Sequence, residues 1–285
     1  MMHKYLIIGL GWLGSPFAMH LVDAGNVVSG TTRSPEKAKR LTQCGIETFL
    51  FDLYEQDASE IPSSAFDDAD VLINLPPGRK NFSSESFVEC MKSLIDIAVS
   101  NGAKHICFIS TTSVFAGLSG RIGNDSVFSP RTASGKAHVE IELYLKDISK
   151  AKGLNTTVLR LAGLVGEDRH PITTLSKKSD IQVGKDPVNL VHQQDVIQAI
   201  NAIFHTVQDK RSANFYAANL CSEEHPSREQ YYTWCAAQKG LRSPTFTPDE
   251  RETGTGKWID AQETTTNLNL TLLYPSPYDM LSSNR

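Results

Sequence analysis

The chain has 285 residues, 40% of them hydrophobic, and a formal net charge of −4 at pH 7. This length is enough to bury a full core and predicts one large domain with a smaller one attached. Because the basic residues are dispersed along an acidic chain, we expect no nucleic-acid partner. No apolar run is long enough to span a bilayer, no apolar signal segment opens the chain, and the five cysteines form no C-x-x-C pair. These features predict a cytoplasmic protein with reduced thiols and no membrane association.

A glycine motif, Gly9-Leu10-Gly11-Trp12-Leu13-Gly14, lies between a predicted strand at residues 5–8 and a predicted helix. In that context Gly9 permits a tight turn and Gly11 admits a pyrophosphate close to the backbone. Gly14 lets the helix pack against the strand. The N–H groups at the helix start, including those of Trp12 and Leu13, would bind the phosphates. The alternative is a glycine-rich turn without a ligand.

The second predicted strand, residues 26–33, ends in Thr31, Thr32 and Arg33. NAD-binding proteins of this kind carry an acidic residue there, which binds the ribose 2′-hydroxyl. Here no carboxylate would repel a 2′-phosphate, and Arg33 is placed to pair with one. The pattern therefore favours NADP over NAD as the cofactor, with Thr32 and Arg33 in contact with it. The alternative is that Arg33 is a solvent-facing loop residue.

Two further strands end where the rest of the cofactor would lie. The third, residues 47–52, ends at Asp52, and this position together with Leu53 is where an adenine ring would pass. The fourth runs from residue 70 to Leu75 and is interrupted by Pro76. Because the loop after this strand borders the cofactor ribose and nicotinamide, Leu75 and Pro76 are predicted cofactor contacts.

Strands and helices continue to alternate after this point. A fifth strand at residues 104–109 runs into the hydroxyl-rich stretch 110–117, and a sixth at residues 156–161 follows another predicted helix. The alternation predicts an α/β fold with a Rossmann-type doubly wound parallel sheet. From residue 167 the pattern loosens. We therefore expect an NAD(P)-binding Rossmann domain over residues 1–166 and a smaller, partly interleaved C-terminal substrate domain over residues 167–285.

Four segments carry a resemblance to a known family. They are the glycine motif at residues 9–14, the stretch 160–166, Arg169-His170-Pro171, and the segment from Asn189 to Val196. With these residues the chain resembles the extended and atypical short-chain dehydrogenases/reductases of the NAD-dependent epimerase/dehydratase superfamily, and among them the YeeZ-like members. The resemblance covers nearly the whole chain. It implies a Rossmann domain with a small C-terminal domain and says little about the substrate.

The resemblance also implies a catalytic set, which is a Ser or Thr after the fifth strand, a Tyr, and a Lys four residues later. Thr111 matches the hydroxyl position, and Lys136 matches the lysine, which also binds the cofactor ribose. The tyrosine position holds Thr132. In the family the phenol acts as acid and base, whereas a threonine hydroxyl ionises far above any physiological pH. Either another group supplies the proton, or no turnover occurs.

His170 is the predicted substitute, because it follows the loop after the sixth strand and its ordinary pKa suits proton transfer. The alternative is that His170 only caps a loop. Two functions stay open. The first is an NADP(H)-dependent oxidoreductase or epimerase/dehydratase that acts on a small polar or nucleotide-linked substrate. The second is a catalytically silent NAD(P)-binding module that senses redox state or regulates a partner. No metal-ligand spacing is present, and the helices at residues 87–98 and 136–150 match the pair that forms a homodimer interface in this family.

Overall fold

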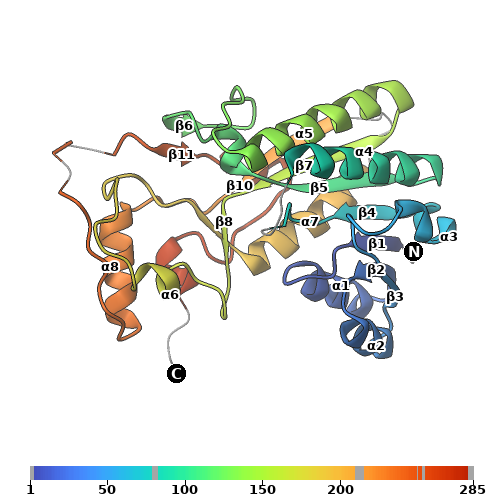
Figure 1. Cartoon of the computed structure of the whole chain (residues 1–285), viewed down its shortest axis with the longest axis horizontal. Coiled ribbons are helices and arrows are strands. Elements are labelled where there is room, and N and C mark those ends of the chain that lie inside the picture. Colours follow the sequence, from blue (N-terminus) through green and yellow to red (C-terminus); the bar gives the residue numbers. More distant parts are fainter. Residues whose placement is uncertain (1–2, 79–82, 209–214, 249, 252–253, 282–285) are drawn as a thin grey trace. The chain divides into compact units, whose positions relative to one another are not determined.

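The structure is a computed structural model that describes residues 3–78, 83–208, 215–248, 250–251 and 254–281. The chain forms two compact units, each assembled from three segments (Figure 1). Unit 1 comprises residues 1–114, 130–159 and 200–217, and unit 2 comprises residues 115–129, 160–199 and 218–285. The two units alternate along the sequence, and the domain boundary at residue 166 stays a prediction. Within the described ranges, no helix is both long and apolar enough to cross a membrane.

A seven-stranded sheet of the order β10-β7-β5-β4-β1-β2-β3 organises unit 1 (Figure 1). Its strands are β1 (Lys4–Ile8), β2 (Val27–Thr32), β3 (Glu47–Leu50), β4 (Asp70–Ile73), β5 (His105–Thr111), β7 (Asn155–Leu161) and β10 (Phe215–Leu220). Because β1 pairs in parallel with both β2 and β4, the strand order reverses at β1. The predicted Rossmann-type doubly wound sheet is confirmed.

Helices connect these strands. They are α1 (Gly14–Asp23), α2 (Pro35–Gln43), α3 (Ser63–Phe66), α4 (Ser84–Ser100), α5 (Ala133–Lys152) and α7 (Gln193–Gln208), with the short 3₁₀ turns η1 (Ala58–Glu60) and η2 (Thr112–Phe115). The predicted start of α2 is confirmed, because the Ser34 side chain accepts a hydrogen bond from the Lys37 backbone N–H and Pro35 is the first helical residue.

Both faces of the sheet in unit 1 are covered, because successive residues of a strand point to opposite sides. Leu6 and Ile8 of β1 belong to the core that includes the inner faces of α4 and α5. Tyr5 points to the other face, where its ring lies 5.7 Å from that of Phe204 in α7, and Phe204 in turn stacks on Phe17 of α1. This buried sheet holds the strand ends, and therefore the loops that follow them, in fixed positions.

Unit 2 contains two small parallel sheets, β6–β11 and β8–β9. Its elements are β6 (Gly120–Ile122), β8 (Gly163–Val165), β9 (Leu190–His192), β11 (Lys257–Ile259), α6 (Ile172–Leu175), α8 (Arg228–Gln238), α9 (Gln262–Asn267) and η3 (Pro277–Met280). Tyr231 of α8 is fully buried in its core, together with residues of β8, β9 and α6. Most of these elements are too short for sequence periodicity to reveal.

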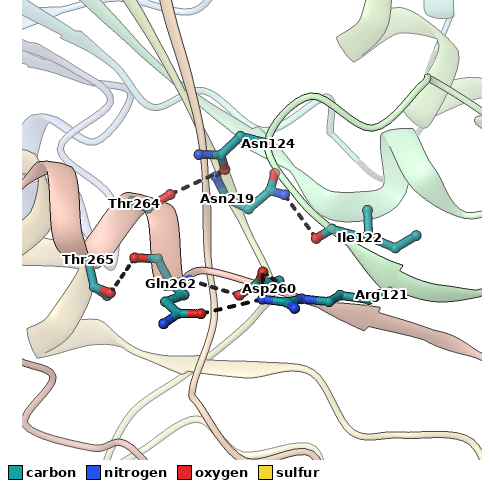
Figure 2. Close-up of polar contacts among 8 residues, drawn as sticks. All are labelled: Arg121, Ile122, Asn124, Asn219, Asp260, Gln262, Thr264 and Thr265. Carbon is teal, nitrogen blue, oxygen red and sulfur yellow. Dashed lines mark hydrogen bonds and ion pairs between the residues drawn. The ribbon is translucent and has the colours of Figure 1, made fainter.

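Polar contacts join the segments of unit 2 that are distant in sequence (Figure 2). The Asn124 side-chain oxygen accepts hydrogen bonds from the Asn219 backbone N–H at 2.7 Å and from the Thr264 hydroxyl at 3.3 Å. The Arg121 guanidinium lies 2.7 Å from the Asp260 carboxylate. Residues 115–129 are thereby fixed to the strand β10 and to the segment after β11.

Candidate functional site

The glycine loop follows β1 and turns sharply into α1. Gly9 has φ +105°, and a Cβ at this position would collide with the backbone carbonyl of Asn74, so only glycine fits there. The Gly9 N–H donates to the Thr31 hydroxyl at 3.1 Å, and the Leu10 N–H donates to the Thr31 carbonyl at 2.7 Å. A Cβ on Gly14 would collide with the Gly9 carbonyl, which is the close packing that the motif predicts.

The start of α1 offers backbone donors. The N–H groups of Leu13 and Gly14 have no hydrogen-bond partner within the described part of the chain. Unpaired N–H groups and the positive end of the helix dipole favour an anion at this position. The loop therefore fits a pyrophosphate on its own geometry.

A cavity of about 350 Å³ lies at the carboxyl ends of β1 to β4 in unit 1. Eight of the predicted cofactor residues line it, namely Gly9, Gly11, Thr32, Arg33, Asp52, Leu53, Leu75 and Pro76. Trp12, Leu13 and Gly14 lie in the adjoining turn and do not line the cavity. The sheet thus brings together, from four separate loops, the residues that the sequence assigned to one cofactor.

Two cations and one carboxylate border this cavity. The Arg33 guanidinium lies 3.3 Å from the Asp52 carboxylate, and the Arg33 side chain is 76% exposed. Lys37, on the first turn of α2, also lines the cavity, with its ammonium 3.5 Å from the Gly11 carbonyl. Burial and the neighbouring Arg40 lower the pKa of Lys37. Lys37 is not among the cofactor residues predicted from the sequence, because it belongs to a basic group typical of a solvated helix face. The predicted helix start at Ser34 and Pro35 was the signal that could have placed Lys37 near the cavity.

Thr111 ends β5 and is part of a tight turn. Its hydroxyl donates to the Ser113 hydroxyl and accepts from the Ser113 N–H, both at 3.1 Å. The first turn of α5 packs on this turn, since a Cβ on Gly135 would lie 3.1 Å from the Ser113 carbonyl. Lys136, the next residue, is exposed. The structure therefore brings the segments of Thr111 and Lys136 together in unit 1.

Thr132 is the N-cap of α5. Its hydroxyl oxygen accepts a hydrogen bond from the Gly135 N–H at 3.0 Å, and its backbone is extended. This contact satisfies one of the donors that a helix start leaves unpaired. The hydroxyl at the family's tyrosine position consequently has a structural role.

His170 lies in unit 2, and it is 8% exposed. One ring nitrogen is 2.9 Å from the Tyr231 hydroxyl, and the other accepts from the Ile172 N–H at 3.2 Å. The Tyr231 hydroxyl itself donates to the Pro277 carbonyl, so the ring is held as a neutral donor to Tyr231. Burial lowers the pKa of His170 to about 4. These contacts favour the role of a capping residue at α6, and proton transfer by His170 stays a prediction.

A Rossmann-fold protein of the short-chain dehydrogenase/reductase type is the class that this fold and glycine loop define. Residues 5–217 match the NAD dependent epimerase/dehydratase family. Protein YeeZ of Escherichia coli (strain K12) is 33% identical over 283 residues, which cover 98% of this chain and 99% of that protein. The chain belongs to the NAD dependent epimerase/dehydratase family, as its motifs predicted.

Two solved structures share the fold over nearly their full length. UDP-glucuronic acid 4-epimerase from Bacillus cereus, in complex with NAD, has a TM-score of 0.79 at 18% identity, covering 98% of this chain and 94% of that one. A functionally unknown conserved protein from Silicibacter pomeroyi has a TM-score of 0.73 at 20% identity, covering 96% and 95%. At these identities the likeness concerns the fold alone.

Proposed function

We propose that this protein binds NADP(H) and prefers it over NAD(H). The observation that carries the proposal is the cavity at the ends of β1 to β4, where the glycine loop, Arg33 and Lys37 meet. The turn at Gly9 and the donors at the start of α1 suit the pyrophosphate. Arg33 and Lys37 lie beyond the end of β2, where the ribose 2′-substituent of a dinucleotide is bound in this fold.

The electrostatics of this end of the cavity favour a phosphate. β2 ends in Thr32 and carries no carboxylate, and the nearby Asp52 is already neutralised by Arg33. Because Arg33 is mostly exposed, its ion pair contributes less than about 1 kcal/mol and is easily exchanged for a phosphate. Lys37 adds a second positive charge whose ammonium is partly withdrawn from water, which strengthens its attraction to an anion.

Fluorescence titration with NADPH and NADH tests this preference. We expect Arg33→Ala and Lys37→Ala each to weaken NADPH binding on the order of tenfold, since a hydrogen bond to a charged group contributes about 1.5–3 kcal/mol. NADH binding should change little. Lys39→Ala is the matched control, because Lys39 is exposed on the same helix and does not line the cavity. Equal affinity of the wild-type protein for NADPH and NADH would contradict the proposed preference.

As an enzyme, the protein would be an oxidoreductase or an epimerase/dehydratase acting on a small polar or nucleotide-linked substrate. The bound nicotinamide supplies hydride chemistry in either case. Thr111 would hold a substrate oxygen, and the Lys136 ammonium would bind the nicotinamide ribose. Lys136→Ala should therefore weaken nucleotide binding. The Bacillus cereus relative of the same fold acts on UDP-glucuronic acid, which supports a nucleotide-linked substrate class.

A second function is a catalytically silent nucleotide-binding module. The specific observation in its favour is that neither proton-donor candidate is placed as an acid, because Thr132 caps α5 and both ring nitrogens of His170 are engaged. Two readouts together separate the functions: NADPH consumption with small aldehydes detects an oxidoreductase, and analysis of the products formed from UDP-sugars detects an epimerase or dehydratase, which returns the hydride to its product and consumes no NADPH. Turnover excludes the silent module, and binding without any turnover favours it.

We further propose a cytoplasmic homodimer that forms through α4 and α5. These helices pack against each other and present an exposed face that includes Leu143, which is 46% exposed. An apolar side chain at the centre of an otherwise charged helix face is the kind of residue that a two-fold helix interface would bury.

A further inference from the structure

Tyr54 is a large aromatic side chain that stands 45% exposed at the wall of the nucleotide cavity. It is nevertheless held at both ends. Its backbone N–H donates to the Asp52 carboxylate at 3.0 Å, and its hydroxyl donates to the Pro77 carbonyl at 3.3 Å. Burial raises the pKa of Tyr54, so the hydroxyl keeps its proton and remains a donor. An ordered aromatic ring left open to a cavity is a surface that a ligand can cover.

The strand order of the sheet shows which loops the hydrogen bond between Tyr54 and Pro77 connects. Tyr54 follows β3 and Pro77 follows β4, and these strands are separated in the sheet by β2 and β1. With neighbouring strands about 4.8 Å apart, the ends of β3 and β4 lie roughly 14 Å apart. The hydrogen bond from Tyr54 to Pro77 therefore joins loops from opposite sides of the crevice.

The lining of the cavity has a polar part and an apolar part. The glycine loop and the cations Arg33 and Lys37 supply the polar part. The apolar side chains of Leu53, Leu75 and Pro76 line the same cavity as Tyr54. Gly78 leaves room beside the ring, since a Cβ there would come only to 4.0 Å from the Tyr54 ring. An exposed aromatic ring beside apolar side chains in one cavity suits a planar heterocycle.

We propose that Tyr54 stacks on the adenine of the bound dinucleotide and that its hydrogen bond to Pro77 acts as a clasp that slows release of the nucleotide. The assignment rests on the proposed NADP(H) binding and adds a residue that contacts the cofactor base. Stacking on an aromatic side chain stabilises a bound base whatever its identity, because every base has a π-face. The ring stacks on the base and the hydroxyl forms the hydrogen bond to Pro77. Substitutions at Tyr54 can therefore test the two roles separately.

The test uses adenosine 2′,5′-bisphosphate, which carries the adenine and the 2′-phosphate without the nicotinamide half. We expect Tyr54→Ala to weaken its binding on the order of tenfold, because the stacking surface is lost. Tyr54→Phe keeps the ring and should retain an affinity near that of wild type for this ligand. With NADPH in stopped flow, Tyr54→Phe should dissociate severalfold faster than wild type, because the clasp is gone. Leu50→Ala is the matched control, since Leu50 is a 50% exposed apolar residue of β3 outside the cavity.

The outcomes distinguish this assignment from the binding proposal that it rests on. If wild-type protein binds neither NADPH nor adenosine 2′,5′-bisphosphate, both are overturned. If wild type binds and Tyr54→Ala binds equally well, only the role of Tyr54 is overturned. Tyr54→Phe as weak as Tyr54→Ala contradicts stacking, and an unchanged dissociation rate in Tyr54→Phe contradicts the clasp. Urea midpoints of all variants report whether the fold is intact.

Discussion

Replacing Thr132 by valine removes the N-cap of α5 with little change in side-chain volume. In the structure the Thr132 hydroxyl accepts the Gly135 N–H at 3.0 Å, with the backbone at φ −106° and ψ 156°. Loss of such a cap destabilises a protein by about 1 kcal/mol. Thr132→Ser keeps the accepting oxygen in the same place, so we expect its stability to stay near that of wild type.

Urea unfolding followed by circular dichroism measures the effect. With a urea dependence of about 3 kcal/mol per molar, a loss of 1 kcal/mol lowers the midpoint by about 0.3 M. We expect this shift in Thr132→Val and not in Thr132→Ser. A valine variant as stable as wild type, or a serine variant as unstable as valine, would refute the capping role.

The same position tests the missing phenol. Thr132→Tyr and Thr132→Phe both lose the cap and gain an aromatic ring, and they differ only in the hydroxyl. If the site lacks nothing but its acid, Thr132→Tyr should oxidise NADPH with generic aldehydes or quinones faster than Thr132→Phe. Equal rates in the two variants would show that a phenol alone does not restore the reaction, and would favour the silent module.

Three further predictions follow from single residues. Gly9→Ala should abolish nucleotide binding in a titration, because its Cβ would collide with the Asn74 carbonyl. The control is Gly25→Ala, at φ +80° in open space, which should bind nucleotide normally and lower the free energy of unfolding by only about 1 kcal/mol. Because burial lowers the pKa of His170 to about 4, the unfolded chain binds a proton there between about pH 6.5 and 4 and the folded protein does not. Stability should therefore fall as the pH falls through this interval, and urea midpoints of His170→Gln should depend less on pH there. In sedimentation, we expect the wild-type protein to have the mass of a dimer and Leu143→Arg to have the mass of one chain. A wild-type protein with the mass of one chain would contradict the proposed interface.

The central sheet could be predicted from the sequence because its inner strands, such as β1 and β4, are buried on both faces. Such strands appear as short apolar runs, for example Tyr5 to Ile8, and each is followed by a turn signal. The glycine motif then fixed the position of the first helix. Short elements such as β6 and α6 were not predicted, because three or four residues carry no recognisable periodicity. Helix starts are set by single caps; the Ser227 side chain accepts from the Gln230 N–H, and α8 begins at Arg228.

That most of the predicted cofactor residues line one cavity could be inferred from the sequence for a related reason. In a doubly wound parallel sheet, the loops after successive strands meet at one edge, whatever their separation in sequence. Asp52 and Leu75 therefore line the same cavity as Gly9. The sequence did not predict that Lys37 lines the cavity, because a basic residue on a helix ordinarily faces solvent. Its side chain reaches the cavity from the first turn of α2.

The surroundings of His170 could not be read from its neighbours in sequence. Its main partner, Tyr231, is 61 residues away, and Pro277 accepts the hydrogen bond that fixes the direction of the Tyr231 hydroxyl. Whether a histidine faces a cleft or a core depends on such long-range packing. The ordinary pKa of histidine, on which the catalytic hypothesis relied, belongs to a solvated ring, and burial in unit 2 removes that condition.

The contacts of Arg33 and Asp52 bear on how the cavity would bind the 2′-phosphate of the proposed cofactor. Asp52 has two attachments, the ion pair to Arg33 and the backbone N–H of Tyr54. If a 2′-phosphate recruits Arg33, Asp52 keeps the second attachment, so the loop that carries Tyr54 remains in place. Arg33 is exposed, so its contact with Asp52 and its contact with a phosphate are screened by water to a similar extent. The exchange of one for the other is therefore close to neutral, and Lys37 would supply the additional attraction for the phosphate. The selectivity for NADPH should accordingly fall in Lys37→Ala as well as in Arg33→Ala.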